Sequence, residues 1–157
     1  MVGLVIADLL LFAVVNTVNI MTFSVFISRV KLPRISHKLA IATTGMAIPA
    51  IAVAALNAKA GSGWLSLVMP LIFIAWAVFA LTVDVIRKQE FRQPRNPKIL
   101  VPFLLLFYVG LGGMGVLTWR IGLTFWAITA VTFALQFGGM AYAFRHGKGY
   151  PRKHKPN

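Results

Sequence analysis

Five long apolar runs, separated by short polar connections, dominate the pattern of the chain. They cover residues 4–28, 39–57, 64–86, 99–119 and 122–144. Each has about the 20 residues that a helix needs to cross a ~30 Å hydrocarbon core. Helical periodicity within them is weak, because a membrane helix is apolar on nearly every side, so length and flanking residues decide the assignment. The pattern predicts an all-α fold: an integral membrane bundle of five transmembrane helices forming a single domain.

The first run differs from a secretory signal peptide. It has no basic segment before it, it is too long, and its basic flank follows it, beginning at Arg29. We expect it to be retained as the first membrane helix.

Lysine and arginine alternate between the connections. The connections after the first and third runs carry four and five of these residues, and the tail at 145–157 carries five. The other two connections carry only Lys59 and Arg120. Because cytoplasmic loops retain Lys and Arg, the sequence predicts an N-terminus outside and a C-terminus in the cytoplasm. We expect a multi-pass integral membrane protein located in a prokaryotic plasma membrane.

The composition agrees with this class. Hydrophobic residues make up 59% of the chain and charged residues 12%, whereas soluble domains are about a quarter charged. The absence of Cys excludes disulfides and thiol chemistry. The net charge of +13 would suggest nucleic acid in a soluble protein, but orientation explains the basic residues here, and we expect no nucleic-acid partner. Attraction to anionic lipid head groups fits them better. The candidate contacts for head groups or cytoplasmic partners are Arg87, Lys88, Arg92, Arg95, Lys98, Arg152 and Lys153.

The first run carries a stripe of polar residues. Asn19 lies about 15 Å in from Arg29, near the midplane, and Asn16 lies one turn closer to the outside. Asp8 falls within about 20° of Asn19 on the helical wheel. An amide in hydrocarbon must find partners or lose several kcal/mol, so this stripe should face protein or water. Two interpretations remain open: contacts between helices, or a path for a substrate or ion.

Asp8 itself is expected at the outer boundary of the membrane. One interpretation is an interfacial acid that begins a helix and is stabilised by the positive end of its dipole. The other is a carboxylate that binds a proton or cation in an outer vestibule. Arg120 and Lys59 are the charged residues expected near the same level.

Two further polar groups are expected near the cytoplasmic side. Gln136 of the fifth run should hydrogen-bond across to Thr43 or Thr44 of the second. Asp84 precedes Arg87 and Lys88 by three and four residues, the spacing of a local ion pair on a helix.

Small residues recur in the second, fourth and fifth runs. They predict close contact between helices, because lipid provides no hydrophobic drive for association. A glycine-lined ligand groove or a face for a partner subunit is the alternative. The residues concerned are Ala47, Ala50, Ala54, Gly110, Gly112, Gly113, Gly115, Gly139 and Ala143.

Residues for catalysis or metal binding are scarce. The histidines His37, His146 and His154 all lie outside the apolar runs, so transmembrane histidines cannot hold a haem within one chain. His37, at the mouth of the second run, is the best lone titratable group, and a solvated interfacial role suits it. No cluster has the spacing of a metal site, and no pair of acids suits acid–base catalysis. We therefore expect no enzyme activity; a cofactor cannot be named, although a lipid or quinone among the helices is compatible.

These observations favour a non-catalytic polytopic membrane protein. It would be an accessory or anchoring subunit of a larger membrane assembly, in contact with membrane lipids and with other subunits or further copies of itself. The alternative is a small carrier or channel with a polar path along the first helix. In that case Asp8 would be the outer contact and Asn19 the contact near the midplane. Gln136 with Thr43 or Thr44 would form the inner polar contacts.

Overall fold

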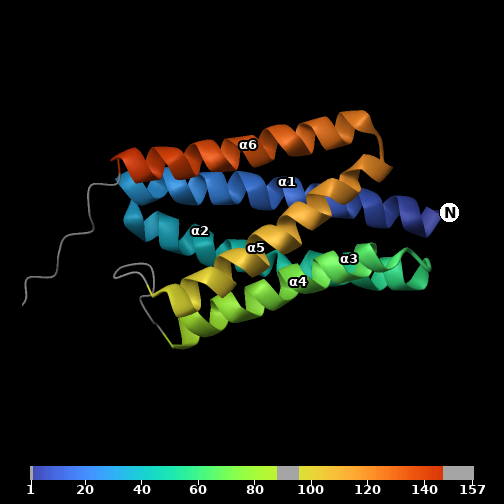
Figure 1. Cartoon of the computed structure of the whole chain (residues 1–157), viewed down its shortest axis with the longest axis horizontal. Coiled ribbons are helices and arrows are strands. Elements are labelled where there is room, and N and C mark those ends of the chain that lie inside the picture. Colours follow the sequence, from blue (N-terminus) through green and yellow to red (C-terminus); the bar gives the residue numbers. More distant parts are fainter. Residues whose placement is uncertain (1, 88–95, 147–157) are drawn as a thin grey trace, which may run out of the picture.

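The chain folds into a bundle of long helices (Figure 1). The computed structural model describes residues 2–87 and 96–146, and every regular element in these two segments is helical. The elements are α1 (Val2–Lys31), α2 (Pro33–Gly45), α3 (Ala47–Lys59), α4 (Trp64–Ala80), the π-helix η1 (Leu81–Ile86), α5 (Pro97–Leu117), the 3₁₀ turn η2 (Thr118–Arg120) and α6 (Leu123–His146).

Five stretches of the described chain are long and apolar enough to cross a membrane. They are Gly3–Lys31, Arg34–Lys59, Trp64–Ile86, Pro97–Arg120 and Leu123–His146. The predictions of an all-α class and of five spans are therefore confirmed, and the length and hydropathy of the spans indicate an integral membrane protein. The orientation of the termini stays a prediction.

The second span differs from its predicted bounds and is divided. Helix begins at Pro33, where the pre-set φ of proline suits the first turn, instead of at residue 39. The chain then breaks at Met46, between α2 and α3. Pro49 accounts for the break, because it has no N–H to donate to Gly45 and its ring crowds that carbonyl.

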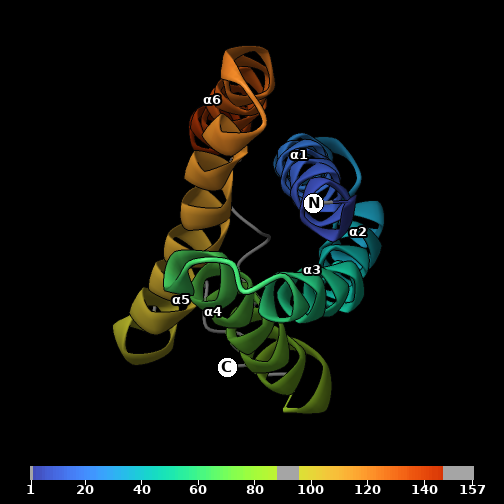
Figure 2. The same cartoon turned by 90° about the vertical axis from the view of Figure 1, so that its right-hand side faces the viewer.

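The helices form an open arc around the long axis of the bundle (Figure 2). α1 packs against α2, α3 and α6, while α4 packs against α3 and α5. α5 crosses the bundle obliquely (Figure 1) and makes few contacts with α6, although the two are consecutive in the sequence. α1 and α6 run side by side in the same direction. This parallel pair brings the polar stripe of α1 against α6.

The buried core lies between α1, α3, α4 and α5. α1 contributes Val15 and Val18, and Trp76 of α4 packs its ring against Phe107 of α5, with centroids 4.6 Å apart. Gly110 of α5 permits the close approach of α4, because a Cβ there would lie 2.7 Å from the backbone nitrogen of Phe73. The predicted close helix packing thus occurs at this glycine.

Candidate functional site

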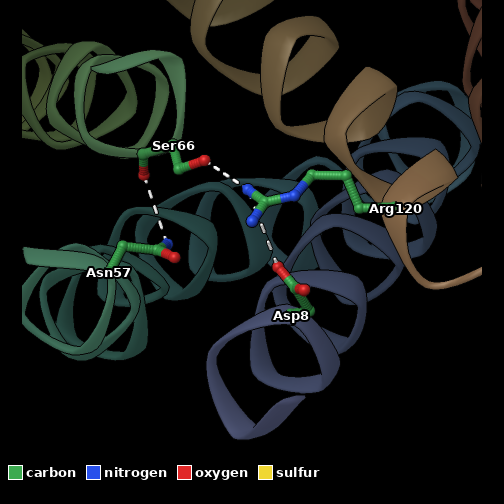
Figure 3. Close-up of polar contacts among 4 residues, drawn as sticks. All are labelled: Asp8, Asn57, Ser66 and Arg120. Carbon is green, nitrogen blue, oxygen red and sulfur yellow. Dashed lines mark hydrogen bonds and ion pairs between the residues drawn. The ribbon is translucent and has the colours of Figure 1, made fainter. Parts of the chain in front are cut away.

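A polar cluster joins the helices at the N-terminal end of the bundle (Figure 3). Arg120 Nη1 lies 4.0 Å from Asp8 Oδ1 and donates a hydrogen bond to Ser66 Oγ. Asn57 Nδ2 donates to the Ser66 carbonyl oxygen at 3.2 Å. The cluster therefore links α1, α3 and α4 to η2.

The position of Asp8 in α1 is incompatible with one of the two roles predicted for it. α1 begins at Val2, so Asp8 lies in the second turn rather than at the helix start, and the interpretation as a dipole-stabilised first-turn acid is wrong. The side chain is 14% exposed, and the guanidinium of Arg120 compensates its charge. The 3₁₀ turn η2 directs Arg120 back over the bundle end (Figure 3).

A second polar network lies deeper, between α1 and α6. Asn16 Nδ2 donates to Thr129 Oγ1 at 3.1 Å, and Asn19 Nδ2 donates to Thr132 Oγ1 at 3.0 Å. Thr132 Oγ1 in turn donates to Asn16 Oδ1 at 2.7 Å. The two amides and two hydroxyls thus form one hydrogen-bonded seam, and we call these four residues the α1–α6 seam.

The parallel direction of the two helices produces this register. Asn16 and Asn19 are each paired 113 positions along the chain, and one turn before them Phe12 packs edge-to-face on Phe125. At the other end of the seam Gly139 faces the ring of Phe23, and a Cβ at Gly139 would lie 2.7 Å from that ring. Matched positions therefore hold the seam in place over several turns.

The threonine partners of the two asparagines are not among the residues predicted from the sequence. Thr129 and Thr132 lie on one face of α6, three residues apart, and Gln136 continues that face. This spacing is the feature of the sequence that indicates a polar face on α6. Inside a membrane helix such a stripe requires partners, just as the stripe of α1 does.

Gln136 does not form the predicted hydrogen bond to Thr43 or Thr44. Both threonines are buried, and each donates its hydroxyl to a carbonyl of its own helix. Gln136 is fully buried, beside the Tyr108 hydroxyl. Within the described segments, neither of its amide atoms reaches hydrogen-bonding geometry with a partner, and the same holds for Asn19 Oδ1.

A polar cavity lies at the opposite, C-terminal end of the bundle. It has a volume of about 90 Å³ and opens between α1, α2 and η1. Its polar lining consists of Arg29, Ser36, His37, Thr44 and Asp84, and we call it the headward cavity. His37 and Asp84 lie far apart in the sequence, and the fold places them on one cavity.

A π-helical turn forms one wall of the headward cavity. Arg87 N donates to the Thr82 carbonyl oxygen at 2.9 Å, a bond that spans five residues instead of four. Such π-turns are rare and occur frequently at functional sites. The predicted ion pair of Asp84 with Lys88 falls on a residue outside the described segments, and the ion pair stays a prediction.

Most of the candidate basic contacts lie outside the described residues. Arg87 and Lys98, at the edges of the described segments, are exposed. The backbone N–H of Lys98 donates to Asn96 Oδ1 at 3.2 Å, so Asn96 caps α5. Five members of the predicted set fall in the undescribed segments: Lys88, Arg92, Arg95, Arg152 and Lys153.

Within residues 2–87 and 96–146, no three His, Asp or Glu side chains stand close enough to hold a metal ion. The chain matches no known protein-family model, and neither a curated protein nor a solved structure is significantly similar to it. Proposals about its function therefore rest on its own residues.

Proposed function

We propose that the chain is a non-catalytic subunit that anchors or stabilises a larger assembly in a prokaryotic plasma membrane. The observation that carries the proposal is the α1–α6 seam. Asn16 and Asn19, the two amides of the polar stripe on α1, donate to threonines of the same chain. Their amides act as contacts between helices, which is the usual role of asparagine in a membrane bundle.

The surface of α6 supports a role in assembly. α6 packs mainly on α1 and lies at the edge of the arc (Figure 2). On the helical face that includes Gly138, it exposes Ile128, Val131 and Leu135. Gly138 has no atom within 4 Å of where its Cβ would be, so a helix from another subunit could approach the backbone closely there.

Native mass measurement after gentle detergent extraction tests the proposal. At native expression, the chain should be recovered within a species heavier than its own 17.2 kDa. Gly138→Leu should reduce that recovery, because a bulky side chain would prevent close helix approach. Gly45→Leu serves as the matched control, since Gly45 also has open space but lies on α2. A clean monomer from wild-type cells would contradict the proposal.

A small carrier or channel is the second candidate function. It is favoured by the polar atoms without partners inside the described bundle, namely Asn19 Oδ1 and the amide of Gln136. Buried polar atoms of this kind occur where a solute or water passes. Transport measured in liposomes separates the two functions, because an anchoring subunit requires no flux.

A further inference from the structure

We infer that the headward cavity binds the phosphoethanolamine head group of a membrane phospholipid. The inference goes beyond the anchoring function and depends only on the membrane placement of the five spans. It rests on the depth of the cavity, on the charges that line it and on the apolar surface beside it.

The cavity lies at the depth of lipid head groups. Arg29 is two residues from the end of α1, and Asp84 is two residues from the end of η1. His37 lies in the first turns of α2, which starts at the same end of the bundle (Figure 1). Each group is thus about one helical turn, ~5 Å, from a helix end. If the spans cross a membrane, these side chains lie at its polar boundary.

Charges of both signs line the cavity. The planar guanidinium of Arg29 suits bidentate contact with a phosphate, and His37 adds a ring N–H. The carboxylate of Asp84 suits an ammonium group. The Ser36 and Thr44 hydroxyls already donate to backbone carbonyls, so their oxygens are available as acceptors for ammonium protons. A zwitterion that carries phosphate and primary ammonium matches both halves of this lining.

The same lining disfavours other common head groups. Phosphatidylglycerol brings a phosphate but no ammonium group that could donate hydrogen bonds to the Asp84 carboxylate. Phosphatidylcholine carries a quaternary ammonium, which has no N–H to donate to the carboxylate or the hydroxyls. Selectivity for ethanolamine over both follows from Asp84.

The size and surroundings of the cavity fit a lipid. A volume of about 90 Å³ is several times what one water molecule needs, so the cavity can admit polar atoms of a head group. Ile41, Leu81 and Val85 also line it and are exposed on the bundle surface. These apolar side chains provide a surface along which the acyl chains can leave the cavity toward the bilayer.

Lipid titration with native mass readout tests the site. Purified protein in detergent is titrated with dioctanoyl phosphatidylethanolamine, phosphatidylglycerol or phosphatidylcholine. We expect the wild type to bind the ethanolamine lipid about tenfold more tightly than the other two, as one charge-assisted contact would give. Asp84→Asn should remove this preference, and Arg29→Gln should weaken binding of all three. Lys59→Gln, an exposed cation at the other end of the bundle, should leave binding unchanged.

A variant that keeps every charge provides an independent test. Ala40 lines the cavity, and Ala40→Leu should fill it and abolish the ethanolamine preference while helicity by circular dichroism stays at the wild-type level. Equal binding of the three lipids to the wild type, or a preference that survives in Ala40→Leu or Asp84→Asn, would overturn the proposal. Water-soluble phosphoethanolamine should bind much more weakly than the lipid. Equal affinity would overturn the assignment to a membrane lipid.

Discussion

Asp8 Oδ1 faces Arg120 Nη1 at 4.0 Å across the N-terminal end of the bundle. The acid of the first span is therefore compensated by the base that precedes the last. Arg120 also donates to Ser66 Oγ, so a single guanidinium contacts both α1 and α4. This arrangement favours a structural role for Asp8.

The Asp8–Arg120 pair should stabilise the bundle modestly. We expect Asp8→Asn to lower the free energy of unfolding by less than ~1 kcal/mol, because the Arg120 side chain is 33% exposed and solvent screens the pair. Arg120→Gln should cost more, since it also weakens the contact with Ser66. Reversible unfolding in detergent micelles, at low and high salt, measures both effects. Additive losses in the double variant would show that the two charges do not interact.

The α1–α6 seam should show measurable coupling. A double-mutant cycle of Asn16→Ala with Thr132→Val should give a coupling of roughly 0.6 kcal/mol, with ~1.7 kcal/mol as the upper end for membrane hydrogen bonds. Ser24→Ala is the matched control, since its hydroxyl donates to the Ile20 carbonyl of its own helix. A coupling indistinguishable from that of Asn16 with Ser24 would contradict the hydrogen bond.

Two glycines should respond differently to a methyl group. Gly110→Ala should destabilise the protein by about 1–3 kcal/mol, because its Cβ would lie 2.7 Å from the backbone of Phe73 and the helices would have to separate. Gly138→Ala should be neutral or stabilising in the isolated chain, since alanine favours helix and the space is open. Thermal unfolding of the two variants in the same detergent measures the difference. Equal losses would argue against close α4–α5 contact.

The predicted orientation requires its own test. A reporter active only in the cytoplasm should give full signal when fused after Asn157 and no signal when inserted near Gly61. The physical reason is the retention of the basic connections and tail on the cytoplasmic side. The reverse pattern of signals would show that the N-terminus faces the cytoplasm.

The five spans were predictable because membrane thickness dictates their length and apolarity. Length and apolarity do not locate the helix ends, because a helix continues into polar residues wherever its backbone can still form hydrogen bonds within the helix. α2 therefore extends back to Pro33. The break at Met46 lies near Pro49, whereas Pro70 and Pro102 lie within continuous helices. The presence of a proline alone therefore does not predict a break.

The inward face of α1 was also predictable, because angular spacing alone places Asn16 and Asn19 together. Their partners were not. A threonine in a membrane helix can donate its hydroxyl to a carbonyl of its own helix, as Thr43 and Thr44 do. The sequence therefore does not distinguish such threonines from Thr129 and Thr132, which bond to another helix. The headward cavity likewise depends on three helix ends meeting and on a π-turn, neither of which the apolar pattern reveals.

The most direct test is to measure flux through the purified protein in liposomes. It shows whether the polar residues inside the spans connect helices or line a path for ions and solutes. Wild-type protein should pass protons, common ions and small solutes no faster than protein-free liposomes. Asn19→Leu should lower stability by at most ~2 kcal/mol and change no flux. A wild-type flux that Asn19→Leu abolishes, in a variant that remains folded and inserted, would contradict this account.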